Sequence, residues 1–134
     1  MSKSVLILDE DPEILTFLTH LLEARKLRVL RARTKAEAFE ILSREYIPVG
    51  LVLANLMLTR MGGPDFRRQV ADIRKGVSVI YMSAFVDSGV IRIEAMQGGT
   101  SAGFSGPDER GVLDAVLSTL KGTRAAAASR IQSH

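Results

Sequence analysis

The chain has 134 residues, of which 46% are apolar and 25% are charged, and it contains neither Cys nor Trp. That balance fits one folded domain and excludes collagen-like and disordered classes, while the lack of Cys excludes disulfide scaffolds and zinc sites built on thiolates. The excess of 18 basic over 15 acidic residues comes entirely from Lys121, Arg124 and Arg130, so residues 1–120 are formally neutral.

The chain begins with a strand-like run followed by an amphipathic stretch. Residues 5–8 (VLIL) predict a strand that is buried on both faces. Asp11 and Pro12 then supply an N-cap acceptor and a proline at the first helical position. One stripe of the predicted helix is apolar: Ile14, Phe17, Leu18, Leu21 and Leu22. Residues 27–32 predict the second strand.

The same alternation of strand and helix continues through the middle of the chain. Thr34 and Glu37 have the spacing of a capping box and predict the start of a second helix. A third strand is expected over residues 49–54, Pro64 opens a third helix, and residues 77–82 predict a fourth strand.

The last part of the chain predicts two more helices around one short strand. Asp87 is interpreted as the cap of a weaker helix that ends near residue 97. Residues 102–105 are expected to form a short final strand. Pro107 opens the last helix, which has an apolar stripe up to Leu120.

Five strand–helix units predict an α/β fold with a doubly wound, five-stranded parallel sheet. We expect a folded domain over residues 1–120 and a basic tail over residues 121–134. The tail lacks an apolar stripe, and three interpretations stay open for it: a disordered end, an extension of the last helix, or a linker to an effector domain C-terminal to this chain.

In such a sheet the binding crevice lies at the carboxyl ends of the strands. The residues found there are Asp9, Glu10 and Asp11, then Asn55, Ser83 and the run Ser105-Gly106-Pro107. With the segments VLILDEDPEIL, LVLANLMLTRMGG, VIYMSA and AMQGGTSAGFSGP, the chain resembles the receiver domain of response regulators over residues 4–120. The resemblance implies a CheY-like, flavodoxin-like fold of strand order 2-1-3-4-5 and a role in bacterial two-component signal transduction.

The resemblance also assigns a role to each position of the site. The family holds Mg²⁺ on an acidic pair, accepts a phosphoryl group on an aspartate, binds its oxygens with a hydroxyl and a lysine, and signals through an aromatic residue. In this sequence the acidic pair corresponds to Asp9 and Glu10, the phosphoacceptor to Asn55, the hydroxyl to Ser83, the lysine to Gly106 and the aromatic residue to Gly103.

Two of these positions carry residues that the chemistry cannot use. A neutral carboxamide at Asn55 cannot form the acyl phosphate, and Gly106 supplies no cation to the phosphoryl oxygens. We therefore expect a phosphorylation-independent pseudo-receiver, not an enzyme, with no resident cofactor and at most weak Mg²⁺ binding at Asp9 and Glu10. Ser83 is expected to keep a structural hydrogen bond.

Two alternatives stay open for this site. In the first, the domain is a phosphorelay regulator with atypical phosphorylation on Asp9, Glu10 or Asp11. In the second, it is a module that binds a small ligand in the glycine-rich segment 98–106, although that segment lacks the nucleotide-binding glycine motifs.

The expected partner is another protein or a second copy of the chain. The resemblance points to the face made by helix four, strand five and helix five, with apolar candidates Val90, Ile91, Ile93 and Met96. No apolar run is long enough to cross a bilayer and no signal peptide is evident, so a cytoplasmic protein is expected.

One basic run lies between the first two predicted helices: Arg25, Lys26, Arg28, Arg31, Arg33 and Lys35. A solvated edge and a docking surface for nucleic acid or an acidic partner are both open. Because residues 1–120 are formally neutral, we expect no nucleic-acid binding by this domain.

Overall fold

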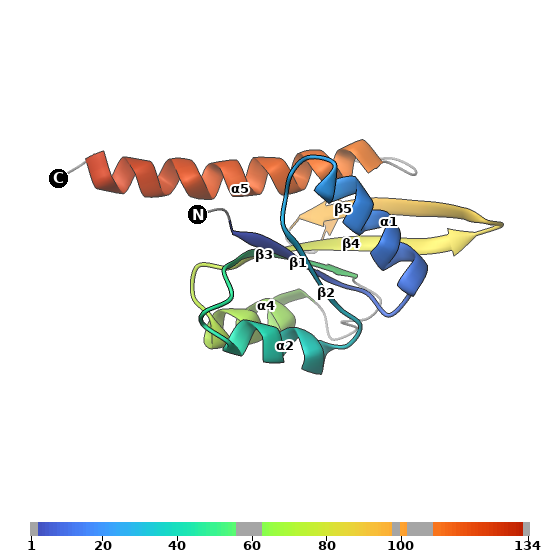
Figure 1. The fold of residues 1–134 in the computed structure, drawn as a ribbon, viewed down its shortest axis with the longest axis horizontal. Helices are drawn as coiled ribbons and strands as arrows, with labels where there is room; N and C mark the ends of the chain where they lie inside the picture. The colour runs from blue at the N-terminus through green and yellow to red at the C-terminus, as the bar shows by residue number, and fades with distance from the viewer. Residues whose placement is uncertain (1–2, 56–62, 98–99, 102–108, 133–134) are drawn as a thin grey trace.

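The computed structural model describes residues 3–55, 63–97, 100–101 and 109–132 (Figure 1). They form a single mixed sheet with helices on both faces. The strands are β1 (Ser4–Leu8), β2 (Val29–Ala32), β3 (Val49–Asn55), β4 (Ser78–Asp87), β5 (Val90–Gln97) and β6 (Thr100–Ser101). Their spatial order is β2-β1-β3-β4-β5-β6, which confirms the predicted order 2-1-3-4-5 for the first five strands.

The first four strands are parallel, and the two central ones are the most apolar. Every residue of β1 and β3 is buried. Strands that are covered on both faces have near-continuous runs of apolar residues, and this is why the segments VLIL and VLA were recognisable in the sequence.

Two helices cover each face of the sheet (Figure 1). Helices α1 (Pro12–Glu23) and α5 (Glu109–Gln132) lie on one face, and α2 (Lys35–Ser43) and α4 (Gly63–Ile73) lie on the other. Successive side chains of each strand point in turn into one or the other of two core layers. The layer under α1 and α5 includes Val5, Ile7, Leu51 and Leu53. The layer under α2 and α4 includes Leu6, Leu8, Val52 and Ala54.

The predicted starts of the first two helices are confirmed by their caps. The Asp11 carboxylate accepts a hydrogen bond of 2.9 Å from the Glu13 N–H, and Pro12 occupies the first helical position. The Thr34 hydroxyl oxygen accepts from the Glu37 N–H at 3.1 Å. Capping of this kind contributes about 1 kcal/mol per helix, and it directs both chain segments away from the carboxyl edge of the sheet.

The predicted helix over residues 87–97 is wrong, because this segment forms the second arm of a β-hairpin. Strand β5 pairs antiparallel with β4, with Asp87 opposite Val90. The two residues between them, Ser88 and Gly89, have φ angles of 52° and 78°. Positive φ at both central positions is the signature of a type I′ turn, the connection that best matches the twist of a hairpin.

The fifth strand is therefore antiparallel, and the expected arrangement of five parallel strand–helix units is wrong at this point. A parallel connection needs a long crossover, whereas a two-residue turn returns the chain directly beside the strand it left. The expected strand over residues 102–105 lies outside the described residues.

The apolar residues assigned to the face of helix four lie on β5 instead. Ile93 is 2% exposed in the core layer under α1 and α5, and the half-buried Ile91 packs against the same layer. Val90 is half exposed at the turn. Met96 pairs through its backbone with Tyr81. Because side chains alternate along a strand, these four residues do not form one helical face.

The last helix is the longest element of the described chain. Helix α5 runs from Glu109 to Gln132, and its C-terminal half extends past the end of the sheet (Figure 1). Among the described residues, no helix combines the length and apolar character needed to span a membrane.

Candidate functional site

The site lies where β1 and β3 end side by side. These strands are parallel, with Leu8 opposite Ala54, so the next residues, Asp9 and Asn55, lie at the same edge. Asp9 is 1% exposed and Asn55 is 6% exposed, which makes them two of the few buried polar side chains in the described chain. The sequence-based expectation that these two strand ends form one site is consistent with this arrangement.

The Asn55 side chain closes the space between the strands. Its Nδ2 donates one hydrogen bond of 2.8 Å to Oδ2 of Asp9 and another of 3.1 Å to the carbonyl oxygen of Ala84. Both partners are acceptors only, so the amide orientation is fixed. A flipped amide would place its own oxygen against two other oxygens.

Both oxygens of the Asp9 carboxylate accept hydrogen bonds. Oδ1 accepts from the Asp11 N–H at 2.9 Å, and Oδ2 accepts from Asn55. Burial raises the pKa of the Asp9 carboxyl, while the hydrogen bonds from Asp11 and Asn55 act in the opposite direction. Among the described residues this buried carboxylate has no ion-pair partner, and neutral donors hold it.

The other two acidic residues have different surroundings. Asp11 caps α1, as described above. Glu10 is exposed, and its carbonyl oxygen accepts two hydrogen bonds from the Arg33 guanidinium, at 3.3 and 3.2 Å. Asp9, Glu10 and Asp11 line a cleft of about 290 Å³ together with Asn55 and residues of β4. The exposed Glu10 and the half-buried Asp11 therefore lie at the opening of the cleft, and the buried Asn55 amide lies at its base.

The arrangement of these groups does not fit a bound Mg²⁺. A hard divalent cation needs oxygen ligands, but the atom that Asn55 directs at Asp9 is a nitrogen that carries hydrogens. Within the described residues, no group of three or more acidic or histidine side chains is placed to hold a metal ion.

Ser83 lies on β4, one residue beyond Met82, which pairs with Asn55. Along β4, Met82 and Ala84 belong to the core layer under α1 and α5, whereas Tyr81 belongs to the opposite layer. Alternation puts Ser83 on the side of Tyr81. Gly103 and Gly106, the positions of the aromatic residue and the lysine, lie outside the described residues.

The Ala84 carbonyl is a site group that sequence reasoning missed. Backbone acceptors have no residue signature, so only the continuation of β4 past Ser83 brings it to Asn55. The residue pair Ser88-Gly89 is the feature of the sequence that could have indicated this group. It predicts a hairpin turn, and such a turn requires β4 to continue past Ser83 as far as Asp87.

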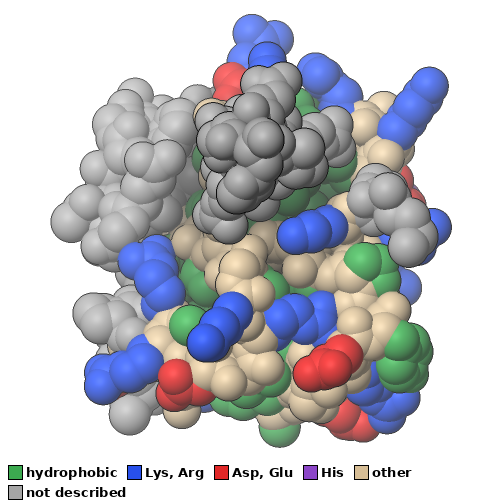
Figure 2. All heavy atoms as spheres, turned by 90° about the vertical axis from the view of Figure 1, so that its left-hand side faces the viewer, with side chains coloured by type: hydrophobic (Ala, Val, Ile, Leu, Met, Phe, Trp, Pro, Cys, Tyr) green, Lys and Arg blue, Asp and Glu red, His purple; other side chains and the backbone are tan. Residues whose placement is uncertain are grey.

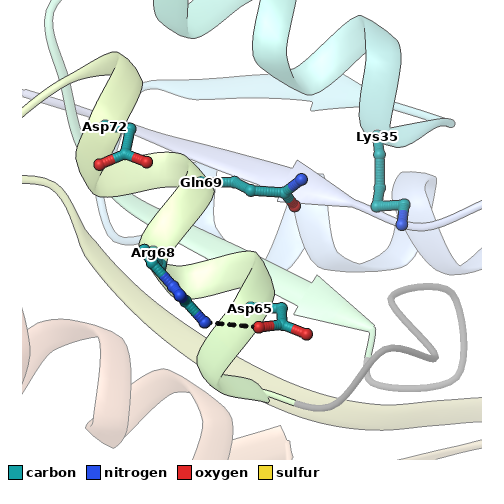
Figure 3. Close-up of a pocket in the computed structure, with 5 residues that line it drawn as sticks. All are labelled: Lys35, Asp65, Arg68, Gln69 and Asp72. Atoms are coloured by element: carbon teal, nitrogen blue, oxygen red, sulfur yellow. Dashed lines mark hydrogen bonds and ion pairs between the residues drawn. The ribbon is translucent and has the colours of Figure 1, made fainter.

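A second hollow, of about 320 Å³, lies between α2 and α4 and is lined by Lys35, Asp65, Arg68, Gln69 and Asp72 (Figure 3). Arg68 and Asp65 form an ion pair of 2.6 Å, and both side chains are more than half exposed. Exposed pairs of this type contribute little, and none of the five described residues that line the hollow is buried. The hollow therefore offers no chemistry comparable with that of the Asp9 site.

The family model described as the response regulator receiver domain matches residues 5–126 of this chain. The chain belongs to the response regulator receiver family. The receiver domain is a signalling module of two-component-type regulators and is generally not an enzyme. No curated protein matches the chain significantly.

Solved structures support the receiver fold. A CheY-like receiver domain protein from Methanospirillum hungatei JF-1 is 18% identical, with a TM-score of 0.68 over 94% of this chain and 99% of that one. The anti-anti-sigma factor PhyR from Bartonella quintana is 22% identical, with a TM-score of 0.61 over 98% of this chain and 52% of that one.

A receiver domain from Clostridium thermocellum is 24% identical, with a TM-score of 0.53 over 59% of this chain. The chain spans 63% of that receiver domain and about half of the Bartonella PhyR chain. At these identities the structural likeness establishes the receiver fold alone.

Proposed function

We propose that this receiver domain is a pseudo-receiver that works by binding another protein without being phosphorylated. The observation that supports this proposal most directly is the hydrogen bond of 2.8 Å from the Asn55 amide to the buried Asp9 carboxylate. In this arrangement the Asn55 amide and the Asp11 N–H donate to the two oxygens of the acidic side chain, which supports a site that works without a cation and without a phosphoryl group.

The chemistry at position 55 supports this proposal. Phosphoryl transfer needs a nucleophilic oxygen, and a carboxamide is neutral and weakly nucleophilic. The sequence also has Gly106 at the position of the family's lysine, and glycine has no side chain to stabilise charge on the transferred group. A receiver with both changes lacks the acceptor and the fixed cation together.

The described surface suggests where a second copy would bind. Exposed apolar side chains gather at the tip of the β4–β5 hairpin: Phe85, Val86 and Val90. Phe85 and Val90 are 49% and 50% exposed. We include self-association through this hairpin tip in the proposal, in place of the helical face expected from the sequence.

The test of phosphorylation independence is direct. The protein is incubated with acetyl phosphate and Mg²⁺, and its intact mass is measured beside a receiver that retains the acceptor aspartate. We expect the mass of this protein to stay unchanged while the control gains one phosphoryl group. Stoichiometric, acid-labile phosphate on this chain would overturn the proposal.

The variants Asp9→Asn, Glu10→Gln and Asp11→Asn would then identify the atypical acceptor. Loss of the mass increase in one of them would establish the alternative of atypical phosphorylation.

A further inference from the structure

Exposed cations outnumber exposed acidic residues at the edge of the sheet where the parallel strands begin. Asp9, Glu10 and Asp11 lie at the carboxyl edge of the parallel strands. The opposite edge, where these strands begin, carries two exposed acidic residues, Glu23 and Glu45, and a larger set of exposed cations: Lys3, Arg25, Lys26, Arg28, Arg44 and Lys75. The cations are the set used below. We call this set the basic edge. Figure 2 faces this side of the molecule and shows many more Lys and Arg side chains than acidic ones.

Backbone hydrogen bonds hold the segments of the basic edge together. Arg28 accepts from Val5 through its carbonyl oxygen at 2.8 Å, and Ser4 donates to the Pro48 carbonyl at 2.7 Å. In addition, the guanidinium of the half-buried Arg74 side chain donates through Nη1 to the carbonyl oxygen of Ile47 and through Nη2 to that of Arg44. The three connections that precede β2, β3 and β4 therefore form one continuous surface with the start of β1.

Most cations of the basic edge have no ion-pair partner in the described part of the chain. Only Arg44 is paired, with Glu40 at 2.8 Å, and both side chains are more than half exposed. Cations that follow a helix are favoured by the helix dipole, which accounts for Arg25, Lys26, Arg44 and Lys75. That explanation does not cover Lys3 and Arg28, which precede strands.

A second observation at the same edge points to a partner. Tyr46 is 77% exposed, the largest value among the exposed large hydrophobic residues of the described chain. Its hydroxyl accepts a hydrogen bond of 3.3 Å from Nη1 of Arg44. Tyrosine and arginine are the side chains that most often dominate the energy of protein interfaces.

We propose that the basic edge binds an acidic segment of a protein partner, with Tyr46 as the central contact. This inference rests on the proposed function, because it names the chemistry of a partner for a protein-binding module. A protein is proposed as the occupant because this edge combines its cations with the exposed ring of Tyr46, a side chain that is enriched at the centres of protein interfaces. Charges farther away than about 8–10 Å are screened, so a partner at this edge experiences chiefly its cations.

Peptide display tests this proposal with the full chain. A library of random peptides is selected against the protein, and selected peptides are synthesised and titrated by fluorescence anisotropy. We expect sequences rich in Asp and Glu. The variant R25E/K26E/R28E should weaken their binding by roughly tenfold or more, with a loss of the salt dependence. Tyr46→Ala should weaken binding as well.

The matched control is R31E/R68E/R110E, which changes the net charge equally at exposed positions outside the basic edge. Equal weakening by both triple variants would overturn the proposal, as would a selection without acidic enrichment. Binding of a random duplex DNA more tightly than the peptides, lost in R25E/K26E/R28E, would replace the acidic protein with nucleic acid.

Repeating the titration after treatment with acetyl phosphate and Mg²⁺ separates the two proposals. Peptide binding that appears only on a phosphorylated chain would overturn phosphorylation independence and leave the basic edge as the surface. Unmodified protein that binds no acidic peptide would overturn the basic edge alone.

Discussion

Asn55 and Asp9, 46 residues apart in the sequence, share a buried hydrogen bond of 2.8 Å between the ends of the two central strands. The amide donates to one carboxylate oxygen, and the Asp11 N–H donates to the other at 2.9 Å. Removing the amide would therefore leave a buried acceptor without its donor, and replacing it with a carboxylate would bring two like charges together.

The variant Asn55→Asp should destabilise the domain by about 3 kcal/mol at neutral pH, because an uncompensated charge is left buried beside Asp9. Urea unfolding measures this change. Millimolar Mg²⁺ should restore part of the stability in the variant, since a cation can bridge two carboxylates, and should have little effect on the wild type. A variant as stable as the wild type without Mg²⁺ would contradict the role assigned to the amide.

The pH dependence of stability should report the burial of Asp9. Its pKa is raised in the folded state above the value of 3.8 expected without the fold. The folded protein therefore binds this proton more tightly than the unfolded chain does. The contribution of Asp9 to the free energy of unfolding should decrease as the pH rises from about 3.8 through the raised pKa, and should be constant above it.

Comparison with Asp9→Asn isolates that contribution from those of other carboxyl groups. The free energy of unfolding is measured for both proteins from pH 3 to 7, and the wild-type value minus the variant value should fall with rising pH. A difference that rises with pH would show that the hydrogen bonds of Asp9 outweigh its burial.

The hairpin turn predicts opposite effects for its two residues. Gly89 has a φ of 78°, so Gly89→Ala should cost about 1–2 kcal/mol because a Cβ is unfavourable there. Ser88 already bears a side chain at a φ of 52°, so Ser88→Gly should stabilise the turn or leave it unchanged. Thermal unfolding of the two variants checks both signs. Equal destabilisation by both would argue against a turn with positive φ at these residues.

Self-association should depend on the hairpin tip. The double variant F85S/V90S removes two half-exposed apolar side chains and should shift the protein to the monomer in sedimentation velocity experiments, with unfolding little changed. Tyr46→Ser, which alters the most exposed large hydrophobic residue of the described chain, should leave the oligomeric state as it is. A wild type that is monomeric throughout the accessible concentration range would exclude this role for the hairpin.

The sequence predicted correctly those elements whose residue pattern is compatible with only one type of local structure. Val5–Leu8 and the capping residues Asp11 and Thr34 are examples, since a short apolar run and a side-chain acceptor each specify their own local structure. Residues 90–97 were different, because Val90, Ile91 and Ile93 suit a helix stripe and a strand equally. The turn at Ser88 and Gly89 decides between them, and the preceding Asp87 was interpreted as a helix cap instead.

The site was predictable to the extent that it is made of side chains at strand ends. Parallel strands end at one edge, which brings Asp9 and Asn55 together. The direction of the Asn55 amide was not predictable, because it is set by the Ala84 carbonyl, and that group reaches the site only through the extended β4.

For the pseudo-receiver proposed above, the buried Asp9 carboxylate keeps its hydrogen bonds from Asn55 and Asp11 whether or not a kinase is active. The fraction of partner bound would then follow from the concentrations of the two proteins and their affinity. Synthesis and degradation of the domain would set its output, and its response time would be that of protein turnover.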